Sequence, residues 1–167
     1  MNVFVTVGST GFNELIHQVS CEKFLKTVKE LGYSSVLVQY GESESAFAPD
    51  RVPAVKVEGY KYKPDITVDM ENADLIICHA GAGSILQALR LPKTKQRSVI
   101  VVSNPTLMDN HQQELANALM KGRYCVATRP SELVEAVQQV RQFSKREFPE
   151  PNLTAFAQVI DSHMGYS

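Results

Sequence analysis

Short apolar runs alternate along this chain with segments whose apolar positions recur every three or four residues. The runs are four to six residues long and rich in Val and Ile, as expected of strands. The spacing of apolar residues between them is typical of amphipathic helices. The six predicted strands cover residues 3–7, 35–40, 55–58, 75–78, 99–102 and 124–127. The predicted helices cover residues 12–19, 20–31, 65–72, 84–89, 109–120, 130–140 and 153–164.

This alternation predicts an α/β fold with a parallel sheet, because each helix must carry the chain back across the sheet. We expect a doubly wound, Rossmann-like sheet in the order 3-2-1-4-5-6, with a ligand crevice between the first and fourth strands. The chain divides into one domain at 1–143, a Pro-containing linker at 144–152, and an amphipathic helix with a tail at 153–167. The apolar face of that last helix has two possible partners, this domain or a second subunit.

Two turns of small residues follow the strands that flank the expected crevice. Gly8-Ser9-Thr10-Gly11 follows the first strand, and Ala80-Gly81-Ala82-Gly83-Ser84 follows the fourth strand and opens a helix. A bare backbone at the start of a helix exposes N–H groups at the positive end of the helix dipole, which favours a phosphate group. The alternative for both turns is a tight strand–helix junction in which small residues serve packing alone.

The second turn matches neither of the common phosphate-binding motifs. The chain lacks the pattern Gly-x-x-x-x-Gly-Lys-Ser/Thr of a P-loop. Leu86 stands where a dinucleotide fingerprint has its third glycine, and the turn follows the fourth strand rather than the first. These departures argue against an NAD(P)-dependent oxidoreductase, which stays the alternative from another enzyme class.

Polar side chains near the crevice supply further candidates. His79 is a candidate general base, or else a histidine that fixes the loop through hydrogen bonds. Asn110, His111 and Gln112 follow the fifth predicted strand and suit sugar hydroxyls, with a solvated helix start as the alternative. The chain has no Asp-x-Asp sequence and no spacing typical of a metal site, so we expect neither a metal ion nor a cofactor.

Net charge, cysteine count and the distribution of apolar residues narrow the classes of function that this chain could have. The 167 residues carry a net charge of −1, which gives no electrostatic reason to expect nucleic acid. The three cysteines are widely spaced and odd in number, which favours a reducing compartment. Without a signal sequence or an apolar run of about 20 residues, the chain is expected to be cytoplasmic. The basic segments Pro92–Arg97 and Lys145–Arg146 are expected to be solvated loops, with contact to membrane phospholipid as the alternative.

Three motifs together resemble a known enzyme family. They are Val5-Thr6-Val7-Gly8-Ser9-Thr10, His79-Ala80-Gly81-Ala82-Gly83-Ser84 and Asn110-His111-Gln112-x-Glu114-Leu115-Ala116. In this order and spacing they resemble the carboxyl-terminal domain of family 28 glycosyltransferases, which have GT-B architecture. Within that family the chain looks most like the short subunits of two-chain UDP-N-acetylglucosamine transferases of dolichol-linked oligosaccharide synthesis. The resemblance covers about residues 2–165.

The resemblance implies an enzyme split between two chains. This chain would bind UDP-N-acetylglucosamine, and a membrane-anchored partner would bind the acceptor, dolichyl-diphosphate-N-acetylglucosamine. The heterodimer would add the second N-acetylglucosamine of the N-glycan precursor at the cytosolic face of the endoplasmic reticulum. The partner is one possible source of the catalytic base. A non-catalytic, nucleotide-sugar-binding regulatory subunit is the alternative.

The family motifs also imply the site residues. The implied substrate-binding residues are Gly8, Ser9, Thr10, Gly81, Ala82, Gly83, Ser84, Gln87, Asn110, His111 and Gln112. The glycine-rich turn at 81–84 would face the diphosphate, and His111 and Gln112 would face the sugar hydroxyls. Gln87 stands where the family often has Glu, so a neutral amide would hold the ribose hydroxyls without charge assistance. Asn13 replaces an Asp that commonly follows the first turn and is a further candidate.

Overall fold

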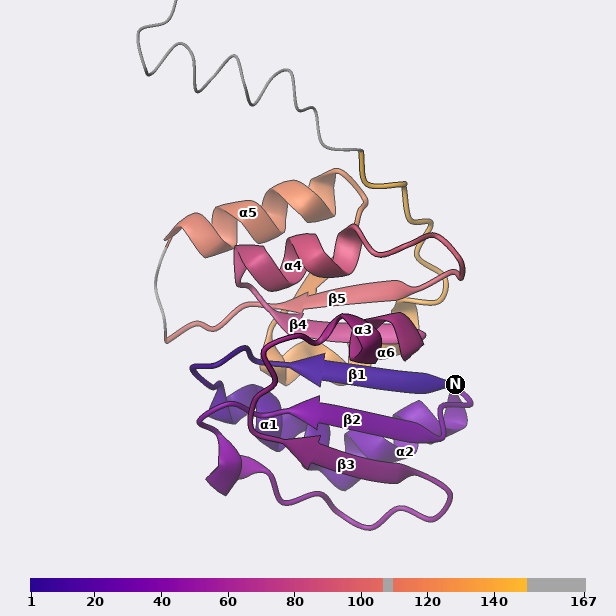
Figure 1. The fold of residues 1–167 in the computed structure, drawn as a ribbon. Helices are drawn as coiled ribbons and strands as arrows, with labels where there is room; N and C mark the ends of the chain where they lie inside the picture. Colours follow the sequence, from indigo (N-terminus) through magenta and orange to yellow (C-terminus); the bar gives the residue numbers. More distant parts are fainter. Residues whose placement is uncertain (107–109, 150–167) are drawn as a thin grey trace, which may run out of the picture.

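The computed structural model describes residues 1–106 and 110–149, which form a parallel six-stranded sheet (Figure 1). The strands are β1 (Asn2–Thr6), β2 (Ser35–Gln39), β3 (Lys56–Tyr60), β4 (Leu75–His79), β5 (Ser98–Val102) and β6 (Val126–Thr128). Their order is β3-β2-β1-β4-β5-β6, which confirms the predicted doubly wound topology. The switch point therefore lies between β1 and β4, as the sequence predicts.

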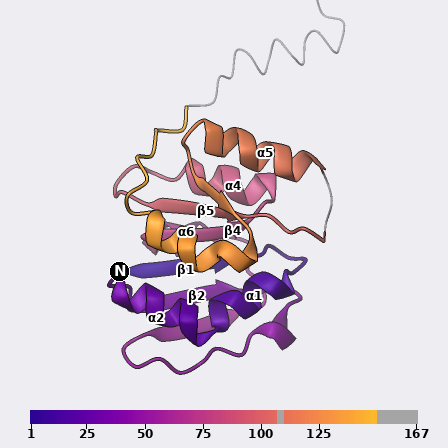
Figure 2. The same cartoon turned by 180° about the vertical axis from the view of Figure 1, so that it is seen from behind.

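Helices cover both faces of the sheet (Figures 1 and 2). One face carries α1 (Asn13–Ser20), α2 (Glu22–Glu30) and α6 (Leu133–Gln139), and the other carries α3 (Thr67–Asn72), α4 (Ala82–Leu89) and α5 (Asn110–Lys121). Short 3-10 turns lie at η1 (Glu44–Ala46) and η2 (Pro130–Glu132). Within residues 1–106 and 110–149, no helix combines the length and the apolar character needed to cross a membrane.

The central strands contribute to two separate cores, because successive side chains of a strand point to opposite faces. In β1, Val5 packs in the core beneath α1, α2 and α6, whereas Phe4 packs in the core beneath α3, α4 and α5. Ile77 and Ile76 of β4 divide in the same way. The continuous apolar runs in the sequence therefore reflect burial on both faces. β3, at the edge of the sheet, keeps exposed residues, as its alternating pattern predicts.

One predicted helix cap is wrong. The sequence pattern favours Ser20 as the N-cap of α2, but Ser20 ends α1, and its Oγ is buried with no hydrogen-bond partner among the described residues. The Glu22 N–H donates instead to Oδ2 of Asp50 at 2.7 Å, and the Asp50 N–H donates to the Ser20 carbonyl at 2.9 Å. A carboxylate from the loop before β3 thus satisfies the start of α2, a contact that no local pattern predicts.

The chain after α6 begins by packing on the domain. The Arg146 N–H donates to the Arg123 carbonyl at 2.8 Å, and the Phe148 ring meets the Tyr124 ring edge to face, with centroids 5.2 Å apart. The division into a domain at 1–143 and a linker at 144–152 stays a prediction. The helix expected at 153–164 lies outside the described residues.

Candidate functional site

The two small-residue turns lie side by side at the carboxyl ends of the parallel strands. Because β1 and β4 are parallel neighbours, the chain leaves Thr6 and His79 at the same edge (Figure 1). A Cβ built on Gly8 would lie 3.0 Å from Cε1 of His79, the last residue of β4, so the first turn packs against the residue that leads into the second. Ser9 and Thr10 are exposed at the tip of the first turn. The structure therefore brings together the two turns that the topology placed at the crevice.

A buried chain of hydrogen bonds holds the first turn. The Gly8 N–H donates to Oγ1 of Thr6 at 3.1 Å, and this hydroxyl donates to Oε1 of Gln39 at 2.6 Å. Thr6 and Gln39 are fully buried, so water does not compete for these bonds. Gly8 has a φ of +71°, a left-handed conformation that glycine adopts without strain. The turn is therefore held in place by the protein itself.

The loop after β2 supports the same turn from the other side. A Cβ on Gly41 would lie 2.8 Å from the Gly8 carbonyl oxygen, so the approach of the two loops requires glycine. Ser43 is buried, and its Oγ accepts a hydrogen bond from the Phe12 N–H at 2.7 Å. The sequence does not predict the roles of Gln39, Gly41 and Ser43, because each acts on residues about 30 positions away. The one local sign of these contacts is that Gly41 ends the second strand.

The first turn of α4 is open to solvent. Gly81 is the N-cap residue, and no side chain caps the helix. Ala82 and Gly83 are exposed, and a Cβ built on Gly83 would have no atom within 4 Å. Ser84 is partly buried and adds a hydroxyl to the same turn. Backbone N–H groups at the positive end of the helix dipole therefore face open space, an arrangement that suits an anion.

His79 fills the space between the two turns. A Cβ on Gly81 would collide with Nε2 of this ring, and a Cβ on Gly8 would lie 3.0 Å from Cε1 and 3.4 Å from Nε2. Nδ1 is buried and has no hydrogen-bond partner in the part of the chain that the structure describes. Burial lowers the pKa of His79 below its ordinary value, although the Thr6 backbone opposes this effect. A neutral ring in contact with Gly8 and Gly81 sets the spacing of the turns by packing, and both roles considered for His79, general base and loop-fixing residue, stay predictions.

A His79→Gln variant is expected to lose less stability in acid than the wild type. The unfolded chain binds a proton at His79 below about pH 6.5, whereas the folded chain keeps the ring neutral to lower pH. The unfolded state therefore binds more protons in this range, and the unfolding free energy falls as the pH drops. The contribution of one group is at most about 1.4 kcal/mol per pH unit.

Denaturant unfolding at a series of pH values between about 7.5 and 5 measures this slope. His17→Gln, at an exposed position on α1, is the matched control and is expected to keep the wild-type slope. Equal slopes for the wild type and His79→Gln would contradict the buried, neutral ring.

Gln87 lies one turn into α4, and its amide nitrogen is already engaged. Nε2 donates to Oγ1 of Thr67 at 3.0 Å, and the Thr67 N–H donates to Oδ1 of Asp65 at 2.8 Å. The bond orients Gln87 and leaves its amide oxygen as an acceptor. The contact between Gln87 and a ribose stays a prediction. Thr67 is a residue that the sequence did not single out, because nothing local links it to Gln87.

The predicted sugar-binding residues are described only in part. α5 begins at Asn110, which confirms a helix after β5, but the side chains of Asn110, His111 and Gln112 lie outside the described residues. Oδ1 of Asn104 accepts hydrogen bonds from the Thr106 N–H at 3.0 Å and from its hydroxyl at 2.7 Å. Asn104 thus shapes the turn after β5. The contacts to sugar hydroxyls stay a prediction.

Among the described residues, neither a metal-binding cluster nor the two buried cysteines add a reactive centre. Across residues 1–106 and 110–149, no cluster of His, Cys, Asp and Glu is arranged to hold a metal ion. Cys78 and Cys125 are buried free thiols, and burial raises the pKa of Cys125 to about 11. Burial also raises the pKa of Cys78. Both thiols therefore stay protonated near neutral pH and serve as core residues.

An open parallel sheet with an uncapped helix at its switch point defines a Rossmann-like domain suited to a phosphorylated ligand. Residues 2–163 match the family model of the glycosyltransferase family 28 C-terminal domain. A UDP-N-acetylglucosamine transferase subunit ALG13 from Yarrowia lipolytica is 32% identical over 172 residues, which cover 99% of this chain and 86% of the relative. The chain belongs to this glycosyltransferase family, among the relatives named ALG13 subunits.

Other relatives show different lengths. The human UDP-N-acetylglucosamine transferase subunit ALG13 is 41% identical over 119 residues, or 71% of this chain, and this chain spans only 10% of the human protein. The solution structure of an ALG13 has a TM-score of 0.68 at 24% identity and covers 95% of this chain and 94% of its own. MurG from Acinetobacter baumannii has a TM-score of 0.62 at 20% identity over 84% of this chain and 41% of its own. At these identities the two structures support the fold alone.

Proposed function

We propose that this chain is the UDP-N-acetylglucosamine-binding subunit of a two-chain N-acetylglucosaminyltransferase. The observation that carries the proposal is the exposed, uncapped first turn of α4 at the switch point, beside the rigid turn at Gly8. The names of the relatives support UDP-N-acetylglucosamine as the sugar donor. The proposed acceptor is dolichyl-diphosphate-N-acetylglucosamine, so the reaction adds the second sugar of the N-glycan precursor.

The proposed positions of the donor follow the two turns. The diphosphate binds at Gly81–Ser84, the ribose lies near Gln87, and the sugar hydroxyls lie near His111 and Gln112. Gly8–Thr10 forms the opposite wall. This arrangement places the anionic part of the donor where the first turn of α4 is open.

The proposed mechanism relies on fixed dipoles. As the acceptor hydroxyl attacks C1 of the sugar, the bond from C1 to the diphosphate breaks and negative charge builds on UDP. The N–H groups of Ala82, Gly83 and Ser84 stabilise that charge, and they need no reorganisation because the helix already holds them. His79 is packed against two glycines, so the base that accepts the acceptor proton is assigned to the partner.

The proposed partner is a membrane-anchored, acceptor-binding subunit. The carboxyl edge of the sheet leaves Ala82 and Gly83 exposed, which provides room for a second chain over the nucleotide. The partner would recruit this otherwise cytoplasmic chain to the cytosolic face of the endoplasmic reticulum. The word subunit in the relatives' names supports a shared enzyme.

Reconstitution tests this proposal. The purified chain is expected to bind UDP-N-acetylglucosamine and to transfer no sugar to a short-chain dolichyl-diphosphate-N-acetylglucosamine, because half of the site is missing. Adding membranes that contain the acceptor-binding subunit of a relative is expected to produce transfer that depends on the amount of this chain. Radiolabelled product extracted into organic solvent measures the reaction.

The outcomes separate the alternatives. Transfer by the isolated chain would contradict the dependence on a partner. Full activity of the membranes without this chain would indicate a regulatory subunit. Saturable NADH binding without any response to UDP would indicate an oxidoreductase.

A further inference from the structure

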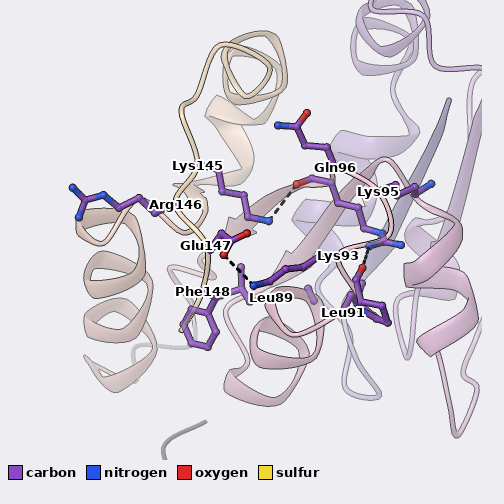
Figure 3. A pocket seen from close by; sticks show the side chains of 12 residues that line it. Leu89, Leu91, Lys93, Lys95, Gln96, Lys145, Arg146, Glu147 and Phe148 are labelled. Atoms are coloured by element: carbon purple, nitrogen blue, oxygen red, sulfur yellow. Dashed lines mark hydrogen bonds and ion pairs between the residues drawn. The ribbon is translucent and has the colours of Figure 1, made fainter. Parts of the chain in front are cut away.

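A hollow of about 280 Å³ lies at the end of the sheet opposite the two turns (Figure 3). It lies among the end of α4, the loop that leads into β5, and the segment after α6. Arg97 comes directly before β5, so the hollow lies at the amino ends of the strands, whereas Gly81 and Gly83 lie at the carboxyl ends. A ligand bound here does not compete with a nucleotide at the switch point.

This hollow joins two basic segments, whose residues Arg97 and Lys145 are 48 positions apart in the sequence. Its lining contains the cations Lys93, Lys95, Arg97, Lys145 and Arg146, and we call it the basic cavity. Among the described residues, Glu147 is the one carboxylate in the same lining. Because the chain as a whole has a net charge of −1, this is a local concentration of positive charge. Arg97 is only 8% exposed, so the expectation of a solvated loop is wrong for this residue.

Arg97 is buried without a carboxylate. Its Nη1 donates to the Pro92 carbonyl at 2.7 Å, and its Nη2 donates to the Glu71 carbonyl at 2.9 Å. Nε also reaches the Glu71 carbonyl, at 3.3 Å. These acceptors are neutral, and no carboxylate of the described residues pairs with this guanidinium. A buried charge without a counter-ion is unfavourable, and an anion in the cavity would compensate it.

Lys145 adds a second cation to the lining and contacts the main chain of Arg97. Its Nζ donates to the Arg97 carbonyl at 3.3 Å, and Figure 3 shows the side chain directed toward the loop. Burial lowers the pKa of Lys145, and the charge of Arg97 acts in the same direction. Lys95, in contrast, already pairs with Asp74 at 3.0 Å. Arg97 and Lys145 therefore both line the cavity, and no carboxylate of the described residues neutralises either cation.

The other part of the cavity is apolar. Leu89, Leu91 and Phe148 belong to the lining, and Phe148 is held by its edge-to-face contact with Tyr124. An inorganic anion would leave this surface unfilled. A ligand with an anionic end and an apolar end would use both parts of the cavity.

We propose that the basic cavity binds a phosphate ester that carries an apolar group. The phosphate contacts Arg97 and Lys145 in the lining, and the apolar group lies against Leu89 and Phe148. The volume of about 280 Å³ is close to the lower limit, roughly 300 Å³, of pockets that bind small organic ligands. A ligand of this kind can come from two sources, a soluble amphiphilic phosphate or the headgroup of a phospholipid at a membrane surface.

Such a ligand would connect the two segments that form the cavity. One set of contacts comes from the loop at 92–97, and the other comes from residues 145–148. Binding therefore stabilises the packing of the segment after α6 on the domain. Amide signals of these two segments, rather than those of residues 8–11 and 81–84, report the binding.

The test is a nuclear magnetic resonance titration of the full chain with dihexanoyl phosphatidic acid below its micellar concentration. Shifts are expected at residues 92–97 and 145–148, and inorganic phosphate is expected to bind more weakly. Lys145→Gln is expected to weaken binding about tenfold through the loss of a charge-assisted contact, and Lys145→Arg is expected to restore it. Lys29→Gln, at an exposed position on α2, is the matched control and should bind like the wild type.

A second arm separates the two sources. Sedimentation with phosphatidylcholine vesicles, with and without phosphatidic acid, measures binding to a lipid surface. Binding of the soluble ester alone supports a soluble ligand, and binding of phosphatidic acid vesicles as well supports a headgroup. The proposal is overturned if neither probe shifts these segments, or if Lys145→Gln binds as tightly as the wild type. Unchanged shifts in the presence of saturating UDP keep this result separate from the proposed function.

Discussion

Replacing Ala82 with Asp is expected to stabilise the fold slightly and to weaken UDP-N-acetylglucosamine binding about thirtyfold. Ala82 is the exposed first residue of α4, and a carboxylate near a helix N-terminus contributes about 0.3–1 kcal/mol to stability. The same carboxylate would repel a diphosphate bound at this turn by roughly 2 kcal/mol in a partly solvated site. Thermal unfolding measures the first effect, and calorimetric titration with the donor measures the second.

Ala82→Asn is the matched control, because it has nearly the same size as Asp and no charge. It is expected to bind the donor within about threefold of the wild type, since the N–H groups of the turn remain available. Opposite changes in stability and affinity would be hard to explain by damage to the fold. Unchanged affinity in Ala82→Asp would contradict a diphosphate at the start of α4.

Gly81→Ala is expected to destabilise the domain by about 1–3 kcal/mol. The new Cβ would collide with Nε2 of the partly buried His79 ring, and movement of this ring is restricted because Gly8 also lies close to Cε1 and Nε2. The φ of Gly81 is −81°, so backbone strain does not contribute and the effect is one of packing. Chemical denaturation measures the loss of unfolding free energy.

Gly83→Ala separates this packing effect from the helix propensity of the same turn. A Cβ at Gly83 meets no atom within 4 Å, and Ala favours a helix over Gly by up to about 1 kcal/mol. The expected result is equal or greater stability than the wild type. Similar destabilisation by both variants would show that His79 is not the reason for glycine at position 81.

The fold was largely predictable because buried strands have a recognisable pattern of apolar residues in the sequence. Val5 and Phe4 point to different cores, so β1 had to be apolar at consecutive positions, and Ile76 and Ile77 show the same pattern in β4. Once these strands were assigned as central and parallel, the right-handed crossovers and the switch point followed. The positions of Gly8 and Gly81 beside the crevice then needed no further information.

The hydrogen bonds that hold the site residues in place could not be predicted from the sequence, because they join segments that are far apart in the chain. Nothing near Thr6 in the sequence indicates its bond to Gln39, and nothing near Gln87 indicates Thr67. Asp50 replaces the local cap expected from Ser20 for the same reason. Each of these contacts exists only after the strands have been placed next to one another.

The glycines of the two turns are explained by different physical causes. Gly8 adopts a positive φ, and both Gly8 and Gly81 leave room for the His79 ring. Gly83 has open space around it, so neither packing nor strain explains it. In the proposed function the diphosphate occupies that space. A side chain at position 83 would therefore favour the helix but would take space that the ligand needs.

The most direct test of the central claim is a nuclear magnetic resonance titration of the wild-type chain with UDP-N-acetylglucosamine. The largest amide shifts are expected at residues 8–11 and 81–87, with further shifts at His111 and Gln112. UDP alone is expected to reproduce the shifts at 81–87 and not those at His111 and Gln112. Shifts confined to other parts of the chain, or no shifts at millimolar donor, would contradict a nucleotide-sugar site at the switch point of this sheet.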